Sequence, residues 1–185
     1  MGKQNHTVSR NFRFNADAAQ SLDFESQRKG ISLNSLVNNI FRRYAEFDRL
    51  AERTDMVTLN RYLLSLLLEL VPEQTLAKEV FEFAKYSGHD NLLFWKKEIS
   101  VETLRDYIVK TLCEYCNLAE YDVTPDGTTF VLTHELGPHG TAFLKAYITG
   151  LIFGCLNENV PVEAAGSTIK FTLDTQSAIK SKIVQ

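Results

Sequence analysis

The 185-residue sequence predicts an α+β fold in two parts. Apolar residues alternate with polar ones along residues 8–14, as in a strand, whereas later segments repeat them every three or four positions, as in helices. Two pairs of short strand-like runs, each around a glycine-containing turn, follow in the last third of the chain. We therefore expect a strand and two helices in residues 1–53, an α+β unit in 54–175 and a tail in 176–185.

The first strand-like stretch has two different faces. Its alternation places Val8, Arg10, Phe12 and Phe14 on one side and Ser9, Asn11 and Arg13 on the other. A helix over 16–30 is predicted next, with Asn15 as its N-cap and Gly30 as its stop. A longer helix over 31–53 follows, with Ser32 as N-cap and an apolar stripe made of Leu33, Leu36, Val37, Ile40, Tyr44 and Phe47.

An isolated strand leaves its backbone hydrogen-bonding groups unpaired, and two short helices cannot bury its apolar face alone. A second copy of the chain solves both problems if the two N-terminal strands pair antiparallel across a two-fold axis. We therefore expect an intertwined homodimer with Phe12 and Phe14 against the helices. The polar outer face of such a two-stranded ribbon fits the major groove of B-DNA.

Residues 7–50, "VSRNFRFNADAAQSL...RKGISLNSLVNNIFRRY", resemble the ribbon-helix-helix family of transcriptional repressors, the Arc/MetJ type. The segment "GISLNSLVNNIFRRY" carries most of the resemblance, because a glycine closes the first helix and a serine caps the second. Many family members have a proline where Asn15 stands here. The resemblance covers about a quarter of the chain, and the remainder matches no family that we recognise.

The resemblance implies that Ser9, Asn11 and Arg13 read base edges in the major groove. Arginine suits guanine and asparagine suits adenine, each pair giving roughly 1–3 kcal/mol of discrimination. It also implies that the N-terminus of the second helix, with Ser32, Asn34 and Ser35, holds a DNA phosphate. No acidic residue stands in that first turn, so the helix dipole favours an anion there. Arg10 lies on the apolar face, where it either snorkels to solvent or turns toward the DNA backbone.

Net charge agrees with a polyanion partner at the N-terminal end only. Residues 1–53 carry nine Lys and Arg against six Asp and Glu, a net +3, and residues 54–185 carry eleven against seventeen, a net −6. Two ordinary explanations remain open. The charge imbalance can reflect only a solvent-exposed face, and residues 8–14 can form an ordinary edge strand. A rival function is a dimeric interaction module, antitoxin-like or scaffold-like, in which DNA binding is weak or secondary.

The second part is predicted to begin with helices over 58–70, 72–87 and 100–117. Pro72 marks a first turn, Gly88 a stop, and Ser100 a cap with an acid at position 102. A hairpin around "TPDG", a helix over 138–157 and a hairpin around Gly166 follow. We expect the two hairpins to form a four-stranded antiparallel sheet with the long helix across one face. The long helix has a wide apolar stripe, consisting of Phe143, Leu144, Tyr147, Ile148, Leu151, Ile152, Cys155 and Leu156.

Catalytic and metal motifs are weak. No glycine-rich phosphate loop, GxSxG or HExxH is present, so we expect no enzyme and no cofactor. Cys113, Cys116, His134 and His139 offer donor types that zinc takes, but their spacing favours packing residues and a turn. The sequence "GPHGT" either binds an anion at a helix start or is a capped turn, and the turn is the more ordinary interpretation.

Composition fits a cytoplasmic, soluble protein. It is 44% apolar and 23% charged, and its longest apolar run, Tyr62 to Val71, is about half of the roughly 20 residues that a membrane span needs. The polar N-terminus lacks a secretory signal, and three cysteines do not make a disulfide framework. We therefore expect a sequence-specific DNA-binding regulator, a repressor that acts as a homodimer or tetramer, with a C-terminal unit for assembly, a protein partner or an effector.

Overall fold

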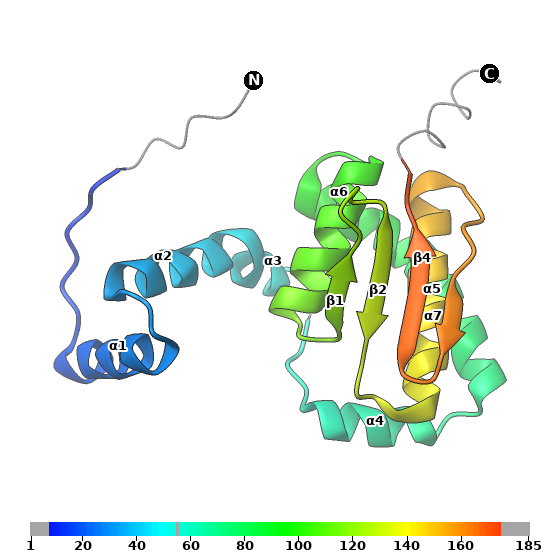
Figure 1. Cartoon of the computed structure of the whole chain (residues 1–185), viewed down its shortest axis with the longest axis horizontal. Helices are drawn as coiled ribbons and strands as arrows, with labels where there is room; N and C mark the ends of the chain where they lie inside the picture. The colour runs from blue at the N-terminus through cyan, green and yellow to red at the C-terminus, as the bar shows by residue number, and fades with distance from the viewer. Residues whose placement is uncertain (1–7, 55, 175–185) are drawn as a thin grey trace. The chain divides into compact units, whose positions relative to one another are not determined.

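The structure is a computed structural model that describes residues 8–54 and 56–174 (Figure 1). The chain divides into two compact units, one up to Arg49 and one from Leu50 onward. The boundary therefore lies within the short helix α3 (Arg49–Ala51), a few residues before the boundary expected from the sequence. The predicted tail, 176–185, lies outside the described residues.

The N-terminal unit has the two predicted helices. Helix α1 (Ala16–Lys29) ends at Gly30, whose φ of 63° is the left-handed conformation that glycine adopts without strain. Helix α2 (Leu33–Arg43) begins after Ser32, whose side chain accepts a hydrogen bond from the Ser35 amide at 3.1 Å. The helical path continues through a π-helical turn, η1 (Tyr44–Asp48), into α3.

The strand predicted over residues 8–14 is not present in the described chain, where residues 8–15 precede α1 without regular secondary structure. The physical reason is that a strand is stabilised by backbone pairing, and this single chain offers residues 8–14 no neighbouring strand. Asn15 does precede α1 in extended conformation, but its side chain makes no capping bond.

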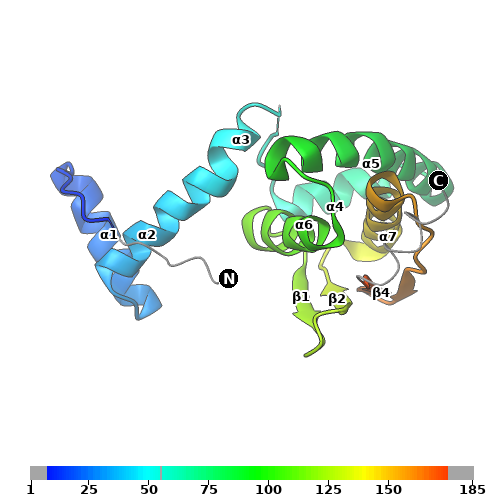
Figure 2. The same cartoon turned by 90° about the horizontal axis from the view of Figure 1, so that it is seen from above.

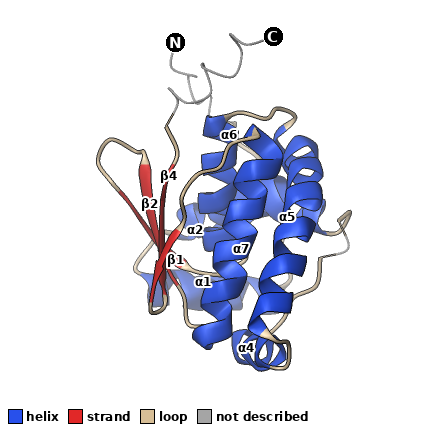
Figure 3. Cartoon of the chain, turned by 90° about the vertical axis from the view of Figure 1, so that its right-hand side faces the viewer, coloured by secondary structure: helices blue, strands red, loops and turns tan. Residues whose placement is uncertain are grey.

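The C-terminal unit contains the predicted four-stranded antiparallel sheet. Its strands are β1 (Glu120–Val123), β2 (Thr129–Thr133), β3 (Glu163–Ala165) and β4 (Thr168–Thr172), in the order β1-β2-β4-β3. The hairpin turns have Gly127 and Gly166 at φ of 72° and 57°, as their turn chemistry predicts. Figure 3 shows the strands of this unit on one side and its helices on the other.

The long helix α7 (Gly137–Leu156) lies against the sheet and against α5 (Glu73–Lys96), which Figure 2 shows running beside it. The buried side chains Phe130 and Phe171 stack on the helix-facing side of the sheet, with ring centroids 5.3 Å apart. Gly150 and Gly154 let α7 approach the backbone of α5, because a Cβ at either position would lie within 2.4 Å of a carbonyl oxygen of that helix. This α5–α7 contact forms the centre of the C-terminal core.

Gly88 does not end α5, so this prediction is wrong: the helix continues to Lys96. Glycine is compatible with the helix interior here because it packs against Leu151 of α7, whose Cδ1 would lie 2.5 Å from a Cβ at position 88. The preceding helix, α4 (Arg61–Glu69), begins after Asn60, whose side chain accepts hydrogen bonds from the Tyr62 and Leu63 amides. It thus starts three residues later than expected.

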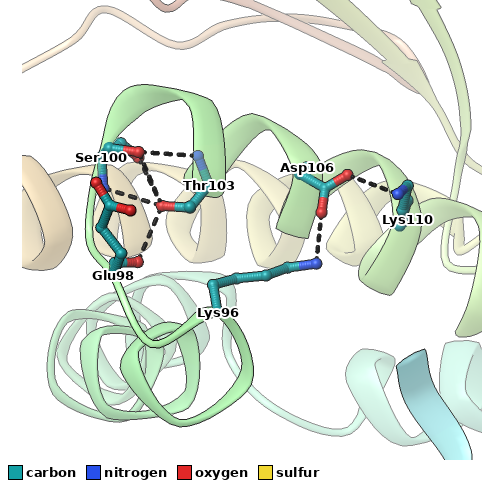
Figure 4. Close-up of polar contacts among 6 residues, drawn as sticks. All are labelled: Lys96, Glu98, Ser100, Thr103, Asp106 and Lys110. Carbon is teal, nitrogen blue, oxygen red and sulfur yellow. Dashed lines mark hydrogen bonds and ion pairs between the residues drawn. The ribbon is translucent and has the colours of Figure 1, made fainter. Parts of the chain in front are cut away.

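The predicted helix over 100–117 is present as α6 (Val101–Asp106) followed by a π-helical stretch, η2 (Tyr107–Tyr115). Ser100 caps α6 through a reciprocal pair of bonds with Thr103, and Asp106 accepts bonds from Lys96 and Lys110 (Figure 4). The contact of Lys96 with Asp106 joins the end of α5 to α6. Within residues 8–54 and 56–174, none of the helices has the length and apolarity needed to cross a membrane.

Candidate nucleic-acid interface

The extended segment 8–14 lies beside α2 in the N-terminal unit. The Phe12 ring is 5.3 Å from that of Phe41 and 6.4 Å from that of Phe14, measured between centroids. Segment and helix enclose a groove of about 550 Å³, lined by Val8, Ser9, Arg10, Asn11, Phe12, Phe14, Leu33, Asn34, Val37, Asn38 and Phe41. Residues from both faces of the segment thus line the groove, and Phe12 makes the ring contact with α2.

Apolar side chains in this unit remain open to solvent. Phe12 and Phe14 are 58% and 50% exposed, and residues of the α2 stripe are also exposed, namely Leu33, Ile40 and Tyr44. Only Leu36 and Phe47 of that stripe are buried. Such a contiguous set of exposed aromatic and aliphatic side chains is the composition of an interface core.

The predicted base-reading residues, Ser9, Asn11 and Arg13, are all exposed. Arg13 does not line the groove, whereas Ser9 and Asn11 reach its rim. Arg10 also lines the groove, and its guanidinium donates a long hydrogen bond, 3.4 Å, to the Ser9 carbonyl. Among the described residues, neither Arg10 nor Arg13 forms an ion pair, which leaves both guanidinium groups available to a phosphate or a base.

Three other basic side chains of the unit are already paired with carboxylates. Glu25 accepts two bonds from Arg28, at 2.6 and 2.8 Å, and lies 3.3 Å from Lys29. The hydrogen bonds from Arg28, aided by Lys29, lower the pKa of Glu25 to about 2. Arg43 is paired with Asp48 at 3.3 Å. The two arginines in 8–14 are therefore in a different electrostatic environment from Arg28 and Arg43.

The predicted phosphate site lies at the start of α2. Ser32 and Ser35 hydroxyl oxygens are 2.8 Å apart, and the Ser35 amide is bonded to Ser32, so this amide is occupied by the cap. No acidic side chain stands in the first turn. The positive end of the helix dipole, the two hydroxyl groups and the Asn34 side chain are left to attract an anion.

The sequence analysis missed two residues of the groove. Asn38 lies one turn after Asn34 on α2, and Phe41 contacts Phe12. The spacing of the asparagines, four residues, was a signal that both share a helix face. Phe41 could not be found in this way, because it stands beside the predicted apolar stripe rather than in it.

The candidate metal donors of the C-terminal unit differ in burial and in their contacts. Cys113 is buried, which raises its pKa to about 12 and keeps it a thiol. The His139 ring bonds to the Leu68 carbonyl at 3.0 Å, while Cys116 is exposed and follows the last residue of η2. In the described part of the chain, no group of three or more His, Cys, Asp and Glu side chains is placed to hold a metal ion.

His134 is buried within a chain of hydrogen bonds. Its Nδ1 accepts from the Leu136 amide at 3.1 Å, so the neutral ring carries its proton on Nε2 and donates it to the Thr141 hydroxyl at 3.0 Å. Thr141 in turn donates to the Gly166 carbonyl at 2.8 Å. The "GPHGT" segment is therefore a helix start that is joined to the β3–β4 turn, and Gly140 leaves room for the imidazole.

Burial lowers the pKa of His134 below its ordinary value of 6.5. The unfolded chain therefore binds a proton more readily than the folded one, and His134 should destabilise the fold as the pH falls below about 6.5. We expect the thermal midpoint of the wild type to fall more steeply between pH 7 and pH 5 than that of His134→Gln, which cannot titrate there. Parallel pH profiles for the two proteins would contradict this assignment.

Comparisons with protein-family models, with curated proteins and with solved structures found no match to this chain.

Proposed function

We propose that this protein is a sequence-specific DNA-binding transcriptional regulator, a repressor, that acts as a homodimer or higher oligomer through residues 8–14. The observation that carries the proposal is the state of this segment in the single chain. It is extended, its backbone has no strand to pair with in residues 8–54 and 56–174, and Phe12 and Phe14 remain half exposed beside α2. A second copy supplies what is missing.

Antiparallel pairing of two such segments satisfies the backbone groups of both and completes a two-stranded ribbon. It also covers the exposed apolar side chains of the groove, including Phe12, Phe14 and Phe41, with those of the partner. Burial of an aromatic side chain contributes roughly 1.5–3 kcal/mol. Several such side chains in each copy offset the entropy cost of association, so the dimer is the stable form of this unit.

The outer face of this ribbon presents Ser9, Asn11 and Arg13 from both copies. A two-stranded ribbon fits the major groove, where Arg13 can donate two bonds to guanine and Asn11 can bond adenine. Ser32, Asn34 and Ser35 at the α2 N-terminus, together with Arg10, would then bind the phosphates that fix the ribbon in register. The net charge of +3 over residues 1–53 adds the attraction that phosphates require.

The C-terminal unit has a net charge of −6 over residues 54–185, which does not suit a second DNA surface. We assign it to assembly, to a protein partner or to an effector. The rival proposal, a dimeric interaction module with secondary DNA binding, makes a different prediction for DNA. Its affinity would show little preference for any sequence, whereas base contacts by the ribbon give preference for one operator.

The test is selection from a random duplex library, followed by sequencing. We expect a palindromic or repeated half-site, and a loss of roughly 1–3 kcal/mol of specific binding for Arg13→Ala with the fold unchanged. Arg28→Ala is the matched control, because this arginine is already paired with Glu25 on α1. It should bind the operator as the wild type does.

Salt dependence completes the experiment. Affinity for the selected operator should fall steeply with salt, because phosphate contacts release counterions, and Arg10→Ala should make that slope shallower. Two results would refute the ribbon as the base-reading element. One is that the protein enriches no sequence, and the other is that Arg13→Ala binds the operator as tightly as the wild type.

A further inference from the structure

Helix α4 is apolar on the side that faces away from its own unit. The outward residues are Tyr62, Leu63, Leu66, Leu67 and Leu70. At 100° per residue these positions form one contiguous half of the helix. Tyr62 is 73% exposed and Leu70 is 78% exposed. Met56, Val57 and Leu59, in the segment that leads into the helix, are exposed as well.

The polar residues of α4 all face inward. Arg61 donates to the Glu135 carboxylate at 2.6 Å and to the Asn117 carbonyl at 3.0 Å. Ser65 donates to the Leu136 carbonyl at 3.0 Å, and Glu69 accepts a bond from the His139 amide. These three residues are spaced four apart and form one stripe, which contacts the segment that leads into α7.

The inner half of α4 is also anchored by leucines. Leu68 is buried with Leu76 and Leu136, and Leu64 packs against this cluster. The helix is therefore apolar on both sides, and its polarity is opposite to that of an ordinary surface helix, which turns its charged residues to water. A contiguous apolar face that is exposed to solvent is typical of an interaction surface, so the outward half of α4 has the character of an interface.

We infer that this outward face of α4 is a contact between two copies of the chain. Charge is the first argument. Residues 56–71 contain only Arg61 and Glu69 as charged side chains, both already engaged, while residues 54–185 carry a net −6. Two such acidic units repel each other over most of their surface, and the uncharged α4 face is where they can meet without unpaired charge.

Symmetry is the second argument. Tyr62 and Leu70 lie equally far, four residues, on either side of Leu66. Two antiparallel α4 helices related by a two-fold axis near Leu66 would place Tyr62 of one copy opposite Leu70 of the other, so the face is complementary to itself. An anionic membrane surface fits less well, since interfacial helices carry free Lys and Arg beside the apolar face. Arg61, the basic residue of α4, is paired with Glu135.

The inference is independent of the ribbon pairing proposed above, and one set of full-length proteins separates the two. The set comprises the wild type, Phe12→Asp to break the ribbon, Leu66→Glu to place two carboxylates at the α4 axis, and the double variant. Because Leu66 is exposed, its substitution should leave the circular dichroism spectrum unchanged. Phe83→Glu on α5, another exposed apolar position, is the matched control.

Sedimentation equilibrium should find that Phe12→Asp still dimerises, and that adding Leu66→Glu raises the dissociation constant by at least about 30-fold, as for an interface hot spot. Adding Phe83→Glu instead should leave the constant unchanged. The inference is overturned if Phe12→Asp is a monomer. This holds equally for a monomer whose α4 amides are protected from hydrogen exchange, because its own N-terminal unit would then cover the α4 face. It is also overturned if Leu66→Glu and Phe83→Glu weaken the dimer equally. Loss of operator binding by Phe12→Asp reports on the ribbon alone.

Discussion

Phe12→Ala should unfold the N-terminal unit and abolish specific DNA binding. In the single chain Phe12 contacts Phe41, and in the proposed dimer both rings are covered by the partner. Truncating a core aromatic residue costs about 3–5 kcal/mol, and a two-fold dimer loses it twice. Because Leu36 and Phe47 are the only apolar side chains buried in the described part of this unit, that loss exceeds what the unit can tolerate. Thermal unfolding, followed by far-ultraviolet circular dichroism, should lose its N-terminal transition.

Phe24→Ala provides the control for this experiment. Phe24 is also an exposed phenylalanine of the N-terminal unit, but it stands on α1 and does not line the groove beside residues 8–14. We expect it to retain both the transition and operator binding. If Phe12→Ala keeps the N-terminal transition and binds the operator as the wild type does, the intertwined dimer is wrong, because that dimer needs Phe12 in its core.

Gly154→Ala should destabilise the C-terminal unit by about 2–3 kcal/mol, the upper range for overpacking. The new Cβ would lie 2.0 Å from the carbonyl oxygen of Lys85 in α5. That atom belongs to a helix backbone, so it cannot rotate away, and α5 and α7 must separate along their contact. Alanine favours helix by about 1 kcal/mol over glycine, which would stabilise the variant if close packing were not the deciding factor.

Gly88→Ala is the matched control, because it is also a glycine inside this helix pair. Its new Cβ would meet the Cδ1 atom of Leu151, the end of a flexible side chain, while the nearest backbone atom is 3.6 Å away. Chemical denaturation should give a distinctly smaller loss of stability for Gly88→Ala than for Gly154→Ala. Equal losses of stability would show that the close approach of the α5 backbone does not make position 154 more sensitive than position 88.

Local chemistry in the sequence was sufficient to predict the elements that depend on one or two residues. Gly30 ends α1, Ser32 caps α2 and Ser100 caps α6, each through backbone or hydroxyl groups a few residues away. Turn glycines likewise predicted both hairpins. The hydrophobic repeat of 138–157 predicted α7 within one residue at each end, and its stripe lies in the core.

Gly88 shows where local reasoning fails. A glycine after an apolar helical run is a common stop signal, and here the same residue instead allows Leu151 of α7 to approach. The two positions are more than sixty residues apart, so the signal that keeps α5 helical does not lie near Gly88 in the sequence. Asn38 and Phe41 were missed in the candidate site for a related reason, since their importance depends on where segment 8–14 lies.

The residue pattern was enough to predict where most helices, hairpins and caps lie, as well as the alternation of apolar and polar residues along 8–14. It also determined a basic N-terminal part and an acidic remainder. Three features depend on the folded chain instead: α5 continues past Gly88, the polar stripe of α4 faces inward, and segment 8–14 has no strand partner among the described residues. The physical reason is that caps and turns are satisfied within a few residues, whereas packing and strand pairing depend on groups distant in the chain or on another copy of it.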